Sequence, residues 1–397
     1  MSQKGSVNLG LIGQAFMGRA HSNAWNQVNR HCNPPVKANL HTVCARNEET
    51  LGAFAELWGW QNTSTDWQAT MANPEIELVD IGVPNDKHLI MAKAAIAAGK
   101  MVCCEKPLAG KFDEAREMVR LAKEANATTF VWYNYRRCPA IAYARMLVDQ
   151  GVLGDVRHVR AFYLQDWADE SVPLIWRFDG EIAGSGSHGD LCAHAIDMVR
   201  FVAGEEVTEV SGALFETFIK ERAIMTAASD GGIAGGSKGD DAQMGKVTVD
   251  DAVLFLARFE GGGVGHFEAT RMATGNQNKL GFEINGTKGS LAFDFEQLNE
   301  LRYYDATCSR GTQGWRTIIT THAPDHPYIE HWWPDSHMIG YEHAFTNMAY
   351  DILRVCAGQE PVVPLPDFED AFKTQCVLEA ATVCANEQRA VKMSELL

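Results

Sequence analysis

An apolar segment near the start of the chain, Val7–Ile12, runs directly into a glycine-rich turn. The turn has Gly13, Ala15 and Gly18, and the residues that follow, 17–28, have the composition of a helix. Gly13 allows a tight turn, the small Ala15 lets the backbone approach a bound group, and Gly18 lets the helix pack closely on the strand. A strand, a turn of this kind and a helix predict the first unit of a parallel, doubly wound sheet.

Strands and helices alternate through the first third of the chain. We expect further strands at 40–45, 78–83, 101–104 and 128–132, and helices at 48–58, 88–98 and 112–125. This alternation is typical of βαβ units, which form a parallel sheet covered by helices. The sequence therefore predicts an α/β Rossmann domain, a doubly wound parallel sheet that binds a dinucleotide, over residues 1–130.

The pattern changes after about residue 133. We expect helices at 140–150 and about 191–202, and strands at 156–164, 207–218, 252–259, 264–273, 280–285 and 290–295, with hairpin turns at 261–263 and 285–289. The segment 229–240 is rich in Gly, Ser and Asp, which indicates a mobile loop. Residues 131–397 are thus predicted to form an α+β domain with an open, mainly antiparallel sheet, for substrate binding and oligomerisation.

Composition limits the classes of partner. The 397 residues carry a formal net charge of −16, which argues against nucleic acid and anionic membranes. The ten cysteines include no Cys-x-x-Cys pair, so we expect a reduced, cytoplasmic protein without structural zinc. No apolar run approaches the ~20 residues of a membrane span, and we expect no secretory segment before the first strand.

The cofactor site is expected around the glycine turn, where the N-terminus of a helix can face phosphates. The second strand ends in Ala45-Arg46, without the acidic residue that NAD-preferring sites usually offer to the ribose. Arg46 could pair with a 2′-phosphate, which favours NADP over NAD, or it could be a solvated arginine at a strand end. Pro84, Asn85 and His88 follow a further strand at the same edge of the sheet, although His88 could instead be a helix residue without a ligand.

Two motifs carry the expected chemistry. Glu105-Lys106-Pro107 directly follows a strand, so that Pro107 can fix the turn and Lys106 can share a proton with a reacting hydroxyl. Asp190 and His194 lie four positions apart, at the spacing of one helix face. We interpret His194 as a general acid or base and Asp190 as the group that orients substrate. The alternative is an Asp that favours the helix dipole and a packed core His. Nothing in the spacing requires a metal.

Together these motifs resemble the glucose–fructose oxidoreductase / inositol dehydrogenase / rhizopine-catabolism (Gfo/Idh/MocA) family. Two further segments, Asn134-Tyr135-Arg136-Arg137 and the glycine-rich run 184–189, support the resemblance. It implies a Rossmann domain, a second domain with an open sheet, homodimers or homotetramers built on that sheet, and Lys106 and His194 as the proton-handling pair beside Asp190. Segments 163–167, 176–178, 183–186 and 326–328 are similar to the branch of levoglucosan-type sugar dehydrogenases, which are NAD-linked.

These observations predict a cytoplasmic NAD(P)-dependent dehydrogenase that oxidises a ring hydroxyl of a sugar or cyclitol to a ketone, or runs the reverse reaction. The alternatives are a glycoside hydrolase or lyase with internally recycled NAD, and a non-catalytic dinucleotide-binding regulator. The predicted cofactor residues are Gly13, Gln14, Ala15, Phe16, Met17, Gly18, Ala45, Arg46, Pro84, Asn85, His88, Glu105, Lys106, Pro107, Asn134, Trp176 and Arg177. The predicted substrate residues are Lys106, Tyr135, Arg136, Asp166, Trp167, Asp190 and His194, and no metal site is expected.

Overall fold

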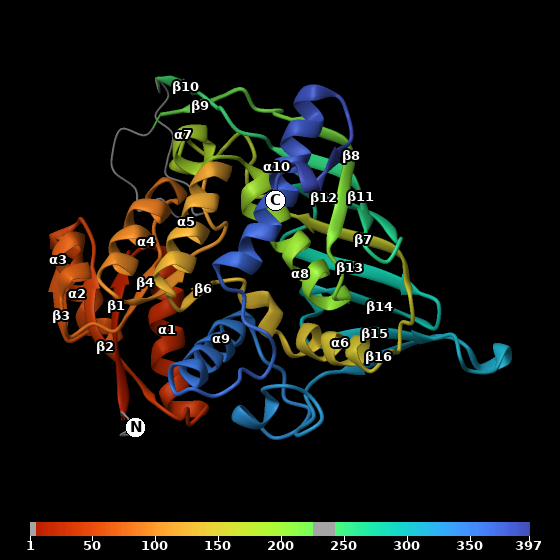
Figure 1. The fold of residues 1–397 in the computed structure, drawn as a ribbon, viewed down its shortest axis with the longest axis horizontal. Coiled ribbons are helices and arrows are strands. Elements are labelled where there is room, and N and C mark those ends of the chain that lie inside the picture. The colour runs from red at the N-terminus through yellow and green to blue at the C-terminus, as the bar shows by residue number, and fades with distance from the viewer. Residues whose placement is uncertain (1–4, 225–242) are drawn as a thin grey trace. The chain divides into compact units, whose positions relative to one another are not determined.

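The computed structural model describes residues 5–224 and 243–397 (Figure 1). The predicted mobile loop at 229–240 lies outside these described residues. The chain divides into two compact units that are not continuous in sequence. The first contains the described residues up to Arg137 together with Tyr328–Trp333 and Gly340–Phe372, and the second contains the remainder of the described chain. The linear division into residues 1–130 and 131–397 stays a prediction.

Among the described residues, the first unit is built around a parallel six-stranded sheet. Its strands have the order β3-β2-β1-β4-β5-β6, so the direction of the chain along the sheet reverses between β1 and β4. This is the order of a Rossmann sheet, and ligands of such sheets bind where the order reverses. The strands are β1 Ser6–Ile12, β2 Lys37–Cys44, β3 Asn62–Ser64, β4 Leu78–Ile81, β5 Met101–Cys104 and β6 Thr129–Val131.

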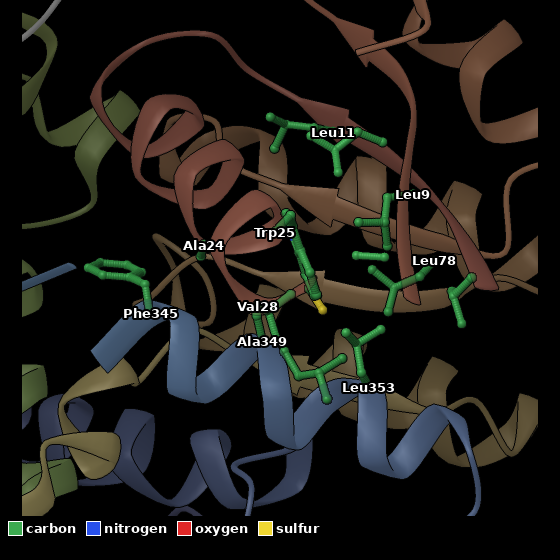
Figure 2. Packing of buried hydrophobic residues seen from close by; sticks show 14 of the residues in the cluster. Leu9, Leu11, Ala24, Trp25, Val28, Leu78, Phe345, Ala349 and Leu353 are labelled. Atoms are coloured by element: carbon green, nitrogen blue, oxygen red, sulfur yellow. The ribbon is translucent and has the colours of Figure 1, made fainter. Parts of the chain in front are cut away.

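The helices of this unit alternate with the strands, as the sequence predicts. They are α1 Phe16–His31, α2 Glu48–Trp58, α3 Trp67–Ala72, α4 His88–Ala97 and α5 Phe112–Ala125. A sixth helix, α9 Tyr341–Cys356, comes from much later in the chain and packs on α1. Figure 2 shows Phe345, Ala349 and Leu353 of α9 turned toward Val28 and Ala24 of α1. The three α9 residues are four positions apart, so they form one apolar helix face.

The second unit is built on a mixed sheet, which has nine strands among the described residues. Its order is β16-β15-β14-β13-β7-β12-β11-β8-β17, and β7 and β12 pair in parallel while the other neighbours are antiparallel. The mainly antiparallel prediction is confirmed. The strands are β7 Val156–Leu164, β8 Val207–Glu216, β11 Ala252–Phe259, β12 Val264–Thr270, β13 Lys279–Gly286, β14 Gly289–Asp294, β15 Glu300–Asp305, β16 Trp315–Ile319 and β17 Val391–Lys392.

Helices α6 Pro139–Asp149, α7 Gly180–Ala183 and α8 Ala193–Ala203 also belong to this unit. A turn of π-helix, His188–Cys192, precedes α8 directly and contains Asp190. The helix predicted at about 191–202 therefore begins earlier and with a wider turn than expected. A two-stranded sheet of β9 Glu221–Ala223 and β10 Met244–Lys246 completes the second unit, and α10 Phe368–Glu387 contributes residues to both units.

Candidate active site

The glycine turn after β1 brings backbone segments into very close approach. Gly13 has a φ of +116°, and a Cβ atom at this position would lie 2.2 Å from the carbonyl oxygen of Gly82, just after β4. A Cβ atom on Gly18 would lie 2.3 Å from the carbonyl oxygen of Gly13. Any larger residue at either position would collide with the backbone, so both glycines are required for this turn to close at the point where the sheet order reverses.

The N-terminus of α1 has the features of an anion site. Ala15, at the N-cap position, forms no side-chain capping hydrogen bond, and the first helical turn contains no acidic residue. The amide groups of this turn therefore lack the side-chain acceptors that usually satisfy them, and the helix dipole favours a negative charge there. Gln14 is tied to α2, because its Nε2 atom donates to Thr50 Oγ1 at 2.8 Å, while its buried Oε1 atom has no hydrogen-bond partner. These residues fit the pyrophosphate of a dinucleotide.

The neighbouring strand end holds Ala45 and Arg46. The Ala45 amide donates to the carbonyl oxygen of Ser64 at 3.1 Å, which continues the pairing of β2 with β3. Arg46 is exposed immediately beyond it. An exposed guanidinium at this position is compatible both with a contact to the adenosine half of a dinucleotide and with a solvated arginine.

His88 connects two strand-end loops. It is completely buried, its Nε2 atom lies 3.0 Å from the carbonyl oxygen of Val83, and its Nδ1 atom lies 3.1 Å from that of Pro107. Burial lowers the pKa of His88, against the opposing effect of these carbonyl groups. The contacts show His88 holding the loop after β4 against the loop after β5. Asn85 begins the short 3-10 turn Asn85–Lys87, and Lys87 is the N-cap residue of α4.

The segment Glu105-Lys106-Pro107 follows β5 directly, and its Lys106–Pro107 peptide bond is cis. Glu105 is buried, and its two carboxylate oxygens have separate partners. Oε2 accepts the backbone N–H of Lys106 at 3.1 Å, and Oε1 lies 3.0 Å from Nε2 of His21, in α1. The backbone of Lys106 is therefore fixed by the Glu105 side chain, which is itself held by His21 of α1.

The other nitrogen of His21 contacts Asp80, a fully buried residue of β4. The distance from His21 Nδ1 to Asp80 Oδ1 is 3.1 Å, and Asp80 also accepts hydrogen bonds from the indole groups of Trp25 and Trp132, both at 2.8 Å. Burial by itself lowers the pKa of His21, but the negative charges and hydrogen bonds of Asp80 and Glu105 outweigh it and raise the pKa to about 9. His21 is thus a buried cation between two carboxylates at neutral pH.

The Asn134–Arg137 turn contains three predicted site residues, all of them buried. The Arg136 guanidinium pairs with Asp370, and the ring of Tyr135 lies edge-on to Tyr341 with centroids 6.4 Å apart. The Nδ2 atom of Asn134 has no hydrogen-bond partner although it is buried. An orphaned amide donor of this kind fits a ligand acceptor, whereas Arg136 has an internal partner.

In the second unit, two arginines hold Asp190. Arg271 Nη2 donates to Asp190 Oδ2 at 2.8 Å, and Arg177 Nη1 lies 3.2 Å from Asp190 Oδ1. Each guanidinium also lies over an indole ring, Arg177 over Trp176 and Arg271 over Trp167. Asp190 is therefore a carboxylate with a fixed orientation and a permanent pair of cations beside it.

The turn of π-helix that carries Asp190 is held at its start by Asp250. One oxygen of this carboxylate accepts the Gly186 amide at 2.7 Å, and the other accepts the His188 amide at 2.8 Å and the Ser187 hydroxyl at 2.6 Å. Gly186 has no room for a side chain, since a Cβ atom would lie 1.7 Å from the Asp250 carbonyl oxygen. Short π-helical turns occur often at functional sites, and this one is stabilised by three hydrogen bonds to a single buried carboxylate.

The remaining predicted residues of the second unit have the following surroundings. His194, in α8, is 6% exposed, and its ring centroid lies 5.9 Å from that of Tyr163. Asp166 accepts the Gly275 amide at 2.9 Å, and Trp167 donates to Gln165 at 2.8 Å. Lys106 belongs to the first unit whereas Asp190 and His194 belong to the second, so their pairing at one hydroxyl stays a prediction.

Sequence reasoning missed four residues that hold the predicted ones in place: His21, Asp80, Asp250 and Arg271. Asp80 had a detectable signal, because an acidic residue inside the apolar run 78–83 must be paired if the strand is buried. His21 and Arg271 had none, because their partners are distant in sequence. Within the described ranges, no three His, Cys, Asp or Glu side chains are grouped as metal ligands, and no helix there is long and apolar enough to cross a membrane.

Comparison with known families assigns both halves of the chain. Residues 7–133 match the oxidoreductase family with an NAD-binding Rossmann fold, and residues 141–292 match the GFO/IDH/MocA C-terminal domain. The chain therefore belongs to the Gfo/Idh/MocA family of oxidoreductases, as the motifs predicted.

Individual relatives refine this assignment. Levoglucosan dehydrogenase from Pseudarthrobacter phenanthrenivorans is 37% identical over 394 residues, which cover 98% of this chain and 99% of that protein. Myo-inositol 2-dehydrogenase from Thermotoga maritima is 24% identical over 391 residues, with 98% and 100% covered.

Solved structures agree. The crystal structure of an oxidoreductase domain protein from Kribbella flavida has a TM-score of 0.90 at 44% identity, and levoglucosan dehydrogenase in complex with NADH has a TM-score of 0.89 at 36% identity. Each comparison covers 98% of this chain and 99% of the other. The predicted family and fold are confirmed, and the predicted preference for NADP receives no support from these relatives.

Proposed function

We propose that this chain is an NAD-dependent dehydrogenase that oxidises a ring secondary hydroxyl of a sugar or cyclitol to a ketone, or catalyses the reverse reduction. The observation that carries the proposal is the 37% identity to levoglucosan dehydrogenase over almost the entire length of both proteins. The similarity to a structure that contains NADH favours NAD over the NADP that Arg46 suggested. Levoglucosan is the first substrate to test, and myo-inositol is the second because of the more distant relative.

Oxidation of a secondary alcohol removes a hydride from carbon and a proton from oxygen. NAD, when bound, supplies the acceptor for the hydride. The proton requires a protein group, and we assign its transfer to Lys106 and His194. Lys106 suits this role because its backbone is fixed by Glu105, which limits the positions its amine can reach. Asp190, oriented by Arg177 and Arg271, would accept a hydrogen bond from the substrate.

The proposed dinucleotide contacts follow the loops at the ends of the strands. Residues 13–18 would bind the pyrophosphate, Ala45 and Arg46 would lie near the adenosine, and the segments Pro84–Asn85 and Glu105–Pro107 would line the nicotinamide end together with Asn134, Trp176 and Arg177. His88 would act through the loops that it connects. Tyr135, Arg136, Asp166 and Trp167 are proposed near the substrate, with Arg136 and Asp166 depending on release of their present partners.

The test is a panel of sugars and cyclitols assayed for absorbance of reduced cofactor, with NAD and with NADP. Levoglucosan, L-sorbose, 1,5-anhydro-D-fructose and myo-inositol are included because relatives or their complexes are named for them. Substrate-dependent accumulation of NADH, or consumption of added NADH in the case of the ketone 1,5-anhydro-D-fructose, supports a dehydrogenase. Turnover without net accumulation would instead indicate an internally recycled cofactor, and binding of NADH without any turnover would indicate a regulator.

The role of His194 is tested by His194→Asn. We expect a loss of roughly 10²–10⁴ in kcat, the usual contribution of a positioned proton-transfer group, with unchanged thermal stability. A packed core histidine would give the opposite result, namely lower stability and nearly normal kcat. Measurement of both quantities on the same preparation therefore separates the two interpretations.

A second copy of the chain is the proposed macromolecular partner, in a homodimer or homotetramer. Leu214 in β8, Leu254 and Leu256 in β11 and Val264 in β12 are all exposed, and Leu254 pairs directly with Leu214. These residues form an apolar stripe on one face of the nine-stranded sheet, and association would cover it. Light scattering after size-exclusion chromatography measures the oligomeric state, and a monomer at micromolar protein concentration would contradict the proposed homo-oligomer.

We place the enzyme in the cytoplasm on the basis of its cysteine content.

A further inference from the structure

The backbone of Lys106 is reached from the interior of the sheet through three ionisable residues. Asp80 contacts His21, His21 contacts Glu105, and Glu105 accepts the Lys106 amide. The first two links have lengths of 3.1 and 3.0 Å, and the side chains of Asp80 and His21 have no solvent exposure. The chain of contacts connects β4, α1 and the end of β5, so it joins three separate elements at the edge of the sheet where the dinucleotide is proposed to bind.

We propose that His21 is a positioning residue for Lys106: by bridging Asp80 and Glu105, it fixes the carboxylate oxygen that accepts the Lys106 backbone N–H. The inference rests on the proposed function, because it assumes that Lys106 handles the substrate proton. His21 itself is assigned no contact with substrate or cofactor.

The geometry of His21 is constrained on every side. The ring of Trp132 stacks on it with centroids 4.2 Å apart, and the ring of Phe345 lies 5.8 Å away. The indole N–H groups of Trp132 and Trp25 fix the Asp80 carboxylate through separate oxygens. Figure 2 shows Trp25 between α1 and the apolar side chains of the sheet. Since the imidazole cannot rotate or move without breaking these contacts, it transmits a fixed orientation to Glu105.

The charges around His21 support a protonated bridge. Asp80 of β4 and Glu105 after β5 are its two carboxylate neighbours. Burial raises the pKa of the Cys103 and Cys104 thiols in β5 well above the usual range, so these groups are neutral, and burial also lowers the pKa of His88 on α4. The aromatic neighbours from α1, α9 and the segment after β6 carry no charge. Both imidazole nitrogens can therefore act as donors, one to each carboxylate.

His21→Gln breaks this bridge, because a single amide group cannot span both carboxylates in the way that the two ring nitrogens do. We expect kcat to fall by on the order of 10- to 100-fold through misplacement of Lys106, while the Kd for NADH changes less than about twofold. The matched control is His41→Gln, which removes another buried histidine of the same unit, located on β2 and bonded to Thr42 at 2.9 Å. The control should keep the kcat of the unaltered enzyme.

A second readout does not depend on turnover. Hydrogen exchange of the Lys106 amide in the cofactor-free protein should accelerate in His21→Gln and not in His41→Gln, because Glu105 loses the contact that holds it. Faster exchange together with lower kcat supports the proposal. Unchanged exchange at Lys106 overturns it even if stability falls, since His21 would then be structural only. Unchanged kcat in a folded His21→Gln protein overturns it as well.

Glu105→Gln provides the same test from the other end of the bridge if His21→Gln does not fold. It removes one carboxylate charge while it conserves the side-chain volume, and it should also accelerate exchange at Lys106 and lower kcat. Normal values of both would contradict the proposal. If the unaltered enzyme oxidises none of the panel substrates, the proposed function fails, and the exchange experiment then still reports whether His21 fixes the Lys106 backbone.

Discussion

The predicted site residues of the first unit and those of the second unit are held by different kinds of charge. In the first unit, the Glu105-Lys106 segment depends on His21, a cation that exists only when the imidazole is protonated. In the second unit, Asp190 lies between Arg177 and Arg271, whose guanidinium groups stay charged at any pH in which a protein folds. Both arrangements fix a predicted site residue through a neighbour, but only the first can be switched off by deprotonation.

The difference also concerns burial. His21 and Asp80 are completely removed from solvent, whereas the side chains of Asp190 and Arg177 are 17% and 16% exposed, although that of Arg271 is only 1% exposed. An ion pair removed from water loses its hydration, and the attraction between the two charges must offset this loss. Removal of one partner is therefore costly, because it leaves an unpaired buried charge, whereas the remaining charge of a partly exposed pair can be rehydrated. The contacts of His21 should therefore respond sharply to substitution and pH, and the Arg177–Asp190 pair should tolerate both better.

The largest effect is expected for Lys106→Ala. If Lys106 transfers the substrate proton, as proposed, its loss should lower kcat by roughly 10²–10⁴, while the Kd for NADH is retained. Lys93→Ala, at an exposed position of α4, is the control. Steady-state kinetics with the best panel substrate and titration of NADH fluorescence measure the two quantities. A normal kcat would remove Lys106 from the mechanism and leave the second unit to supply the proton-transfer group.

The second unit is tested through Asp250→Ala. This change leaves the Gly186 and His188 amides and the Ser187 hydroxyl without their shared acceptor, so the free energy of unfolding should fall by about 3 kcal/mol. Asp169→Ala, which removes an exposed carboxylate bonded to Ser171, should cost much less. Urea denaturation measures both. Equal losses would mean that the turn of π-helix needs no support from Asp250.

The pH dependence of stability compares the two arrangements directly. Because the pKa of His21 is raised to about 9 in the folded protein, its stabilising contribution is complete below about pH 6.5 and is lost as the pH rises through 9. The loss should amount to at most about 3 kcal/mol and should be absent in His21→Gln. The ion pairs of Asp190 with Arg177 and Arg271 should contribute nothing to this loss of stability at alkaline pH.

Burial lowers the pKa of His88 and of His188, so these two histidines act in the opposite direction, and stability falls as the pH drops below about 6.5. Urea denaturation between pH 5 and 10 therefore gives a curve with both an acid and an alkaline decline. His41→Gln should keep the alkaline decline. If His21→Gln keeps it too, the bridge between Asp80 and Glu105 is not its source.

Local patterns predicted the Rossmann half well, because each βαβ unit is specified within about thirty residues. The turn at Gly13 and Gly18 and the strand before Glu105 are where the sequence indicated. Helix α9 was missed as part of this half, since its apolar face at Phe345 and Ala349 matches a surface formed more than 300 residues earlier. The sequence of α9 alone does not indicate against which sheet the helix packs.

Local sequence patterns also could not predict the residues that hold the predicted site residues in place. In the sequence, nothing distinguishes His21 from other helix residues, because its partners Asp80 and Glu105 are 59 and 84 positions away. The π-helical turn at Asp190 depends on Asp250, which is more than 60 positions from the amides that it accepts. Spacing within one segment was enough to propose which residues act, whereas the residues that hold them are determined by tertiary contacts.

The smallest effect is expected at Arg46, an exposed residue beyond the end of β2. If it contacts the adenosine half of the cofactor, Arg46→Ala should weaken NADP relative to NAD, because a 2′-phosphate loses a cationic partner whereas a 2′-hydroxyl does not. Exposed charge pairs contribute about 0.2–1 kcal/mol, so the ratio of the two Kd values should change less than about fivefold. Titration of both reduced cofactors in the mutant and in Lys37→Ala, a lysine at the opposite end of β2, measures this ratio. An unchanged ratio would assign Arg46 to solvent and leave the discrimination to the backbone and shape of the site.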